Sequence, residues 1–199
     1  KNQPSLVGEL VGTDGAVSVG LVQRVLRNLL TNGIPIRELT AILESLAENA
    51  PRTKNPGTLT ELVRKSLNRT ITEQYKTDKD KVMAITFNPT VEHQLTTALA
   101  QEGGELTLNL PTELAMDLNR KVADAWKSAM DQGHESIVLL CDARLRASLA
   151  RMLNRTLPML PVVAYDEIVL GTDVLPVETI GPSQTESASK SEAQEMAPV

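Results

Sequence analysis

The 199-residue chain is acidic, with a formal net charge of -5, and 41% of its residues are hydrophobic. This charge argues against a surface that attracts nucleic-acid phosphates or anionic lipids over a large area, so no nucleic acid is expected among its partners. The length suits one ordinary domain or two small ones, and the 2% aromatic content means that aliphatic side chains must fill the cores.

Helices are predicted at the start of the chain. A short helix is expected over residues 4–11, followed by a turn at residues 12–15. Ser18 is a good N-cap for a second helix, because its hydroxyl can accept a hydrogen bond from a backbone N–H of the first turn. That helix has apolar residues at three- and four-residue spacing and is expected to end near Asn32 and Gly33.

A third helix is predicted over residues 33–51, and the rest of the chain is organised around it. Pro35 suits its first turn, since a fixed φ and a missing N–H fit a position without a hydrogen-bond partner, and Pro51 ends it. The spacing predicts an inward apolar stripe of Ile36, Leu39, Ile42 or Leu43, and Leu46. The residues expected outside are Arg37, Glu38, Thr40, Glu44, Ser45 and Glu48.

A fourth helix is predicted after the polar connector 52–57. Thr58 and Glu61 have the spacing of a capping box, so the helix should begin there and continue through Ile71. The resulting helical unit is reminiscent of a winged helix, and one end is locally basic through Arg52, Lys54, Arg64, Lys65 and Arg69. A winged-helix DNA-binding regulator is therefore an alternative function, although the acidic balance elsewhere favours a solvated face or a protein contact.

A polar and charged run at residues 72–81 separates this unit from a second part. The run carries almost no apolar residue that could join the two. We therefore predict a helical subdomain over residues 1–76, an α/β subdomain over 77–181 and a flexible tail over 182–199, which has no apolar periodicity.

The second part has both strand and helix periodicity. Strands are predicted at residues 82–87, 136–141 and 162–165, with an extended piece at 105–110. Helices are predicted at residues 90–101, 111–132 and 143–155, the last capped by Asp142. The pattern predicts a mixed α+β or α/β fold, in which an all-helical, winged-helix-like subdomain precedes a small α/β subdomain with a short, partly parallel sheet and a right-handed crossover.

Few residues have a pattern that suggests chemistry. His93 and His134 lie in different predicted elements, with no cysteine or carboxylate at metal-ligand spacing. Cys141 is interpreted as a core residue, and the glycine pair 103–104 lacks the rest of a phosphate-binding loop. Asp142 lies where open α/β sheets bind ligands, but an N-cap role explains it. No catalytic, metal or cofactor site is predicted, and an α/β nucleotide-binding domain is kept only as an alternative.

Cysteine content and hydropathy bound the compartment. Cys141 is the single cysteine and cannot form an internal disulfide, and no signal peptide begins the sequence, which fits a reducing cytoplasm. The apolar stretches fall short of the roughly 20 residues that cross a bilayer, so a soluble chain is expected. The sequence begins with Lys1 rather than Met, which indicates a fragment of a longer protein.

Two blocks of the sequence are more specific than their periodicity. The first, LVQRVLRNLLTNGIPIRELTAILESLAENAPRTKNPGTLTELVRKSL, covers residues 21–67, and the second, SIVLLCDARLRASLARMLNRTLPMLPVVAYDEI, covers residues 136–168. They resemble the cytoplasmic domain of the flagellar and virulence type III secretion export-gate family, the FHIPEP family, and the resemblance extends to about Ile180. Small departures are Asn49 and Asn55, which stand where acidic residues are common in the family, and the run 164–166.

The resemblance implies a non-enzymatic component of a protein-export gate at the cytoplasmic face of the bacterial inner membrane. It implies a full protein with a transmembrane part and further subdomains upstream, which forms a homo-oligomeric ring beside other export-gate membrane proteins. Its implied partners are export chaperone–substrate complexes and the stalk of the associated ATPase, during flagellum assembly. The candidate interaction residues are Arg24, Arg27, Asn28, Arg37, Glu38, Arg64, Asp142, Arg144, Asp166 and Glu167.

Overall fold

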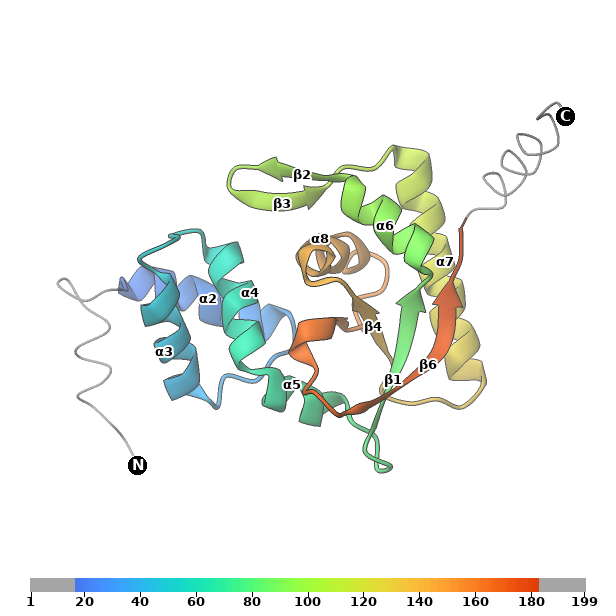
Figure 1. The fold of residues 1–199 in the computed structure, drawn as a ribbon, viewed down its shortest axis with the longest axis horizontal. Helices are drawn as coiled ribbons and strands as arrows, with labels where there is room; N and C mark the ends of the chain where they lie inside the picture. Colours follow the sequence, from blue (N-terminus) through green and yellow to red (C-terminus); the bar gives the residue numbers. More distant parts are fainter. Residues whose placement is uncertain (1–16, 183–199) are drawn as a thin grey trace, which may run out of the picture.

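The computed structural model describes residues 17–182, in which a group of helices lies beside a sheet that is covered by further helices (Figure 1). The helix predicted over residues 4–11 and the tail beyond residue 182 lie outside the described residues. An all-helical part comes first along the chain, and a part with alternating strands and helices follows. The predicted mixed α/β fold class is therefore confirmed.

The helical part contains α2 (Val19–Thr31), α3 (Leu39–Asn49), α4 (Pro56–Ser66) and α5 (Asn68–Tyr75). α2 begins as predicted, because the Ser18 hydroxyl accepts a hydrogen bond from the Leu21 N–H at 3.3 Å. Just after its end, Gly33 takes a φ of 72°, and the Ile34 N–H bonds back to the Leu29 carbonyl at 2.9 Å. This left-handed turn directs Ile34 into the core, where it is buried.

α3 begins at Leu39 and not at the predicted Pro35. Residues 34–38 form no helix, because the turn after α2 places Ile34 in the core. The chain runs from this buried residue to the start of α3 at Leu39 without helical structure. Leu39 is 42% exposed, so its predicted place in the inward stripe is wrong, whereas Ile42, Leu43 and Leu46 are buried as predicted. Ser45 was expected outside but is buried, since it shares their helical face.

α4 begins before the predicted N-cap, and the predicted fourth helix is interrupted. The Asn55 side chain caps α4 by accepting a hydrogen bond from the Thr58 N–H at 3.0 Å, and Pro56 occupies the first helical position. Glu61 therefore makes no capping box at Thr58. At Leu67 the backbone leaves the helical conformation, with φ -93° and ψ 17°, so that α4 and α5 are separate helices.

The α/β part is built on a four-stranded sheet of β1 (Lys81–Phe87), β4 (Val138–Cys141), β5 (Val162–Ala164) and β6 (Asp173–Ile180). The strand order is β5-β4-β1-β6, and every neighbouring pair is parallel. The predicted strands correspond to β1, β4 and β5. β6 was not predicted, because Pro176 and Glu178 interrupt its apolar pattern. Its proline is tolerated because β6 lies at an edge of the sheet.

Helices and a hairpin connect these strands: α6 (Pro89–Thr97), β2 (Leu99–Glu102), β3 (Glu105–Leu108), α7 (Thr112–Asp131) and α8 (Ala143–Leu153). The helix predicted over residues 90–101 ends early, because its last residues pair with β3 in an antiparallel hairpin. Gly103 and Gly104 form the hairpin turn with φ values of 58° and 86°, a conformation that favours glycine at both positions.

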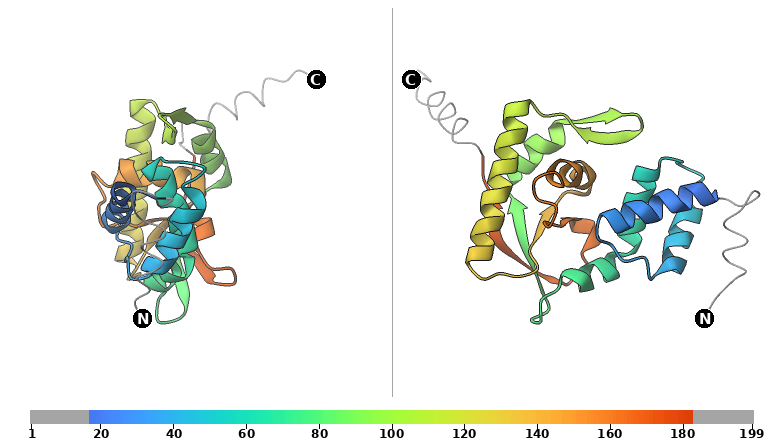
Figure 2. Two further views of the ribbon diagram at one scale, coloured as in Figure 1. Left: turned by 90° about the vertical axis from the view of Figure 1, so that its left-hand side faces the viewer. Right: turned by 180° about the vertical axis from the view of Figure 1, so that it is seen from behind.

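The sheet lies between two apolar clusters. On one face, Val82 and Ala84 of β1 pack in the same cluster as Val25, Leu46 and other apolar residues of the helical part. On the other face, sheet residues such as Ile85, Leu139 and Ile180 pack with α6, α7 and α8. Figure 2 shows the same arrangement from two further sides. The helical part thus covers one face of the sheet directly, while the division of the chain at residues 76 and 77 stays a prediction.

Candidate functional site

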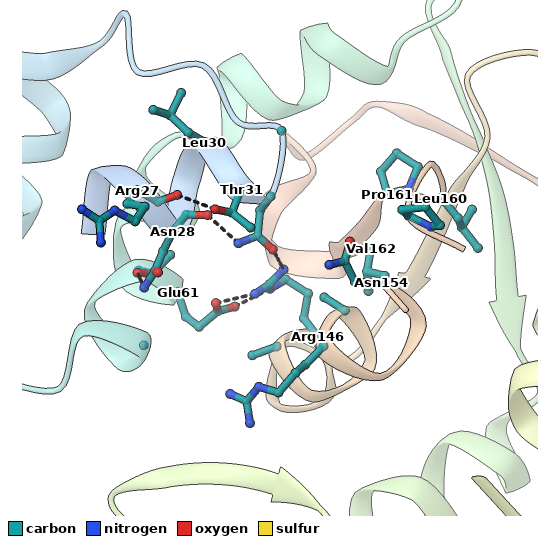
Figure 3. Close-up of a pocket in the computed structure, with 18 of the residues that line it drawn as sticks. Arg27, Asn28, Leu30, Thr31, Glu61, Arg146, Asn154, Leu160, Pro161 and Val162 are labelled. Atoms are coloured by element: carbon teal, nitrogen blue, oxygen red, sulfur yellow. Dashed lines mark hydrogen bonds and ion pairs between the residues drawn. The ribbon is translucent and has the colours of Figure 1, made fainter. Parts of the chain in front are cut away.

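A groove of about 890 Å³ lies where the helical part meets α8. One wall is formed by α2 and α4, and the other by α8 and the loop at residues 157–162 that leads into β5 (Figure 3). Three predicted interaction residues, Arg24, Arg27 and Asn28, line the α2 wall. The groove is therefore a concave surface that contains several of the residues predicted to contact partners.

A network of polar side chains joins the two walls of the groove. Arg146 on α8 forms a two-pronged ion pair with Glu61 on α4, with 2.5 Å between Nη2 and Oε1 (Figure 3). The same guanidinium donates to Asn32 Oδ1 at 3.3 Å, and Asn32 in turn donates to the Asn28 carbonyl at 2.6 Å. Only 3% of Arg146 is exposed, so its charge is held at the floor of the groove by partners from the helical part.

The β2–β3 hairpin closes one end of the groove. Glu105 accepts a hydrogen bond from Arg151 of α8 at 2.9 Å, and Ser148 of α8 donates to the Leu106 carbonyl at 2.8 Å. On its other side, the Glu105 carboxylate lies so close to Gly57, in the first turn of α4, that a Cβ at this position would collide with it. The hairpin therefore contacts α8 and the start of α4 at once, and a residue larger than glycine at position 57 would disturb this contact.

A second ion pair also joins the helical part to the α/β part. Arg64 of α4 donates to Glu167 from Nε at 2.5 Å and from Nη2 at 2.7 Å, and the Ala164 N–H donates to the same carboxylate at 3.0 Å. The exposed fractions of the Arg64 and Glu167 side chains are 1% and 2%. Burial alone would lower the pKa of Arg64, but the hydrogen bonds and charge of Glu167 outweigh it and raise that pKa above its ordinary value.

This burial corrects two predictions. Arg64 and Glu167 were candidates for an exposed interaction surface, but each neutralises the other inside the molecule, more than ninety residues apart in sequence. It also weakens the DNA-binding alternative, because Arg64 belonged to the predicted basic end and Lys65 at that end pairs with Asp166 at 3.3 Å. What was expected as a basic stripe is partly neutralised.

Asp142 and Arg144 lie away from the groove, at the carboxyl end of β4. The Asp142 carboxylate caps α8 through the Arg144 N–H at 2.9 Å and pairs with the Arg144 guanidinium. Hydrogen bonding from Arg144 lowers the pKa of Asp142 below its ordinary value. Glu92 accepts the Asp142 N–H at 2.8 Å, and burial raises the pKa of Glu92. These groups satisfy one another, as the N-cap interpretation predicts.

The other residues singled out in the sequence have ordinary surroundings. Arg37 and Glu38 are exposed in the segment before α3, and Cys141 is fully buried, with a thiol pKa that burial raises well above its ordinary value. Within residues 17–182, no group of three or more potential metal ligands is found. Over the same range, no helix combines the length and apolar character needed to span a membrane.

Sequence reasoning missed the residues that build the groove from the α8 side, among them Arg146 and Arg151. Both belong to a helix whose other arginine, Arg144, faces its own N-cap, and the residue type alone does not tell which arginine meets Glu61. The only available signal was the recurrence of arginines along 144–151, which marks a charged helix but not its partner.

Comparison with known proteins gives a family and several relatives. The model of the FHIPEP family matches residues 1–173. The flagellar biosynthesis protein FlhA of Proteus mirabilis is 35% identical over 165 residues, which are 83% of this chain and 23% of that protein. FlhA of Escherichia coli strain K12 is 35% identical over 181 residues, 91% of this chain and 25% of that protein. The chain thus spans about a quarter of the length of these relatives.

Solved structures share the fold. The C-terminal domain of InvA is 26% identical with a TM-score of 0.76, over 90% of this chain and 53% of that one. CdsV of Chlamydia pneumoniae, in its complex with CdsO, is 25% identical with a TM-score of 0.74, over 90% of this chain and 52% of CdsV. Nonameric SctV-C of EPEC, at 20% identity and a TM-score of 0.75, covers 88% of this chain and 52% of that one, and shows the fold alone.

The resemblance seen in the sequence is therefore confirmed by independent comparisons. The matched range includes the helical part, the sheet strands β1, β4 and β5, and both walls of the groove, and it ends at the first residue of β6. Because the family model matches most of the chain, this protein belongs to the FHIPEP family.

Proposed function

We propose that this chain is part of the cytoplasmic side of a type III protein-export gate and serves there as a non-catalytic docking platform. The observation that carries the proposal is the match of the FHIPEP family model to residues 1–173, supported by 35% identity to flagellar biosynthesis proteins. The groove between α2 and α8 supplies a concave surface on which another protein can dock. The full protein would lie at the bacterial inner membrane, with this chain on its cytoplasmic face.

The proposal includes a ring. EPEC SctV-C, which shares the fold, is nonameric, and we propose that the full-length protein also assembles into a homo-oligomer. The chain spans only about a quarter of the flagellar relatives, so much of the contact area of such a ring would come from other segments. The 199-residue chain by itself should then be a monomer or a weak oligomer at micromolar concentration, because ordering subunits costs free energy that a reduced interface does not offset.

The proposed partners are proteins. The complex of CdsV with CdsO supports a stalk-type partner from the ATPase complex, and the family membership supports export chaperone–substrate complexes and other export-gate membrane proteins. The residues proposed to contact partners or neighbouring subunits are the members of the predicted set that are not buried. Six are exposed, namely Arg24, Arg27, Arg37, Glu38, Arg144 and Asp166, and two are partly exposed, namely Asn28 and Asp142.

Two measurements test the proposal. Sedimentation of the full-length protein in detergent should give a closed multimer, and a strain lacking the protein should recover protein export only when residues 17–182 are present in the complementing copy. A full-length protein that stays monomeric at all concentrations, or export that is restored without residues 17–182, would contradict the docking-platform role. DNA binding that weakens with salt, or saturable nucleotide binding, would favour the two alternatives instead.

A further inference from the structure

We propose that the groove between α2 and α8 binds an acidic peptide segment of a partner protein, with Arg24 and Arg27 as the residues that recognise its carboxylates. The inference deepens the proposed docking role and rests on it. It is carried by the charge balance of the groove, by the absence of ion-pair partners for these two arginines among residues 17–182, and by an apolar rim that a purely ionic ligand would leave exposed.

The groove is basic although the chain is acidic. Its charged lining residues are four arginines and two glutamates: Arg24, Arg27, Arg146, Arg151, Glu61 and Glu105. Both glutamates are already neutralised, Glu61 by Arg146 and Glu105 by Arg151. The positive charge that is left comes from Arg24 and Arg27, in a chain whose formal net charge is -5. Such a local excess attracts a negatively charged segment and repels a basic one.

Arg24 and Arg27 are placed to act together. They are three residues apart on α2, so that both side chains lie on the same face of that helix, and both are exposed. No residue of the described part of the chain forms an ion pair with either of them. Asn28 lies on the same wall, and its amide donates to Thr60 at 3.1 Å, which fixes the wall against α4. The guanidinium groups are therefore available on a firm support.

Apolar side chains give the ligand a second requirement. Leu30 on the α2 side is 56% exposed and Met159 on the loop side is 77% exposed, and both line the groove. Exposed apolar side chains that border a concave site are typical of protein-binding surfaces. A ligand with carboxylates and at least one aliphatic side chain would satisfy both features. In a helical ligand, the Cβ atoms of two acidic residues three or four positions apart are about 5–6 Å apart, so both carboxylates can face two arginines that lie on one helical face.

The occupant is assigned to another protein and not to this chain's own residues 183–199. That segment is also acidic, with three glutamates and one lysine. However, the described chain ends at Pro182, which lines a different pocket beside α7, and α7 lies on the opposite side of the molecule from α2 (Figure 1). A segment of a partner protein needs no such path across the molecule.

The test is a fluorescence-anisotropy titration of the 199-residue chain against a short labelled peptide of alternating glutamate and leucine. A matched peptide has glutamine in place of each glutamate. We expect the acidic peptide to bind at low ionic strength and to lose affinity as salt is added, and the glutamine peptide to bind at least about tenfold more weakly. The double variant Arg24→Glu with Arg27→Glu should weaken binding of the acidic peptide by a similar factor.

The control variant is Arg52→Glu with Arg69→Glu. It changes the net charge by the same amount through two exposed arginines of the helical part that do not line the groove, and its affinity should stay near that of the parent. Met159→Asp on the opposite rim, at a highly exposed position, should also weaken binding without unfolding the chain. These variants separate a groove-specific effect from a general effect of charge.

Three results would overturn the proposal. These are equal affinity for the acidic and glutamine peptides, equal loss in the groove and control variants, or tighter binding of a peptide of residues 183–199 at the same groove. Because the titration needs neither a ring nor a secreting cell, its failure would leave the export-gate role standing. Conversely, a failed export complementation with intact peptide binding would count against the export-gate role alone.

Discussion

The buried ion pair between Arg64 and Glu167 offers the sharpest test of how the two parts of the chain are held together. Glu167→Gln keeps the size of the side chain but removes the charge that compensates Arg64, which is 1% exposed. Breaking a buried pair by removing one partner costs on the order of 3–5 kcal/mol, because the remaining charge stays buried. Arg64 Nη1 already lacks a hydrogen-bond partner within the described residues, and the remaining contact of the guanidinium is a long hydrogen bond to the uncharged Val162 carbonyl at 3.4 Å.

The expected loss of unfolding free energy is large relative to the total stability of a domain. Domains are typically stable by about 5–15 kcal/mol, so this single change removes a considerable fraction of the free energy of unfolding. For a chain of this size, a loss of about 1 kcal/mol lowers the melting temperature by about 2–4 °C. Glu167→Gln should therefore lower the melting temperature by roughly 6–20 °C. Arg64→Met should have an effect of the same order, since it leaves the Glu167 carboxylate buried and uncompensated.

The measurement is urea denaturation followed by circular dichroism, with Asp166→Asn as the matched control. Asp166 is the neighbour of Glu167 and pairs with Lys65, but this pair is largely exposed, and such pairs contribute about 0–1 kcal/mol. A Glu167→Gln variant whose unfolding free energy falls by less than that of Asp166→Asn would refute the assignment. The assignment would also be refuted if the loss of unfolding free energy in the Arg64→Met, Glu167→Gln double variant equalled the sum of the two single losses, because residues that form a pair show coupled effects.

Three further predictions concern packing, chemistry and the tail. Leu46→Ala should cost about 2–5 kcal/mol because the side chain is fully buried, whereas Leu39→Ala, at 42% exposure, should cost well below that; urea titrations of the two variants that give the opposite order would contradict the register of α3. Burial raises the folded-state pKa of Cys141, so the thiol of the unfolded chain ionises at lower pH than the thiol of the folded chain. The free energy of unfolding should therefore fall as pH rises above about 8.5. The buried thiol should also resist a thiol-reactive dye, and rapid labelling of the folded chain would contradict this. Deleting residues 183–199 should leave the melting temperature nearly unchanged, because that segment has few apolar side chains to offset about 1–2 kcal/mol per residue of ordering cost; a drop of several degrees would show that it packs on the chain.

The helix and strand positions were largely predictable because their signals are local. The caps at Ser18 and Asp142 depend on a hydroxyl or carboxylate within three residues of its partner, and both are present as expected. The continuous apolar run at β4 also predicts a strand from local sequence, since a strand buried on both faces has few polar positions. The errors lie at the ends of elements, where two local signals compete. Thr58 and Asn55 both have the side chain of a good N-cap, and in the structure Asn55 caps α4.

The sequence by itself determined the family, the existence of most helices and strands, and the scarcity of chemically active clusters. Only the tertiary structure decided which charged residues are buried and which remain free. Arg64 and Arg24 look alike as residues of amphipathic helices, yet one is neutralised by a glutamate over a hundred residues away and the other has no ion-pair partner within residues 17–182. β6 and the groove could likewise not be predicted from the sequence, because an edge strand and a concave surface are defined by the segments that lie beside them. Pairing across such sequence distances depends on how the sheet and helices pack, and no local pattern records it.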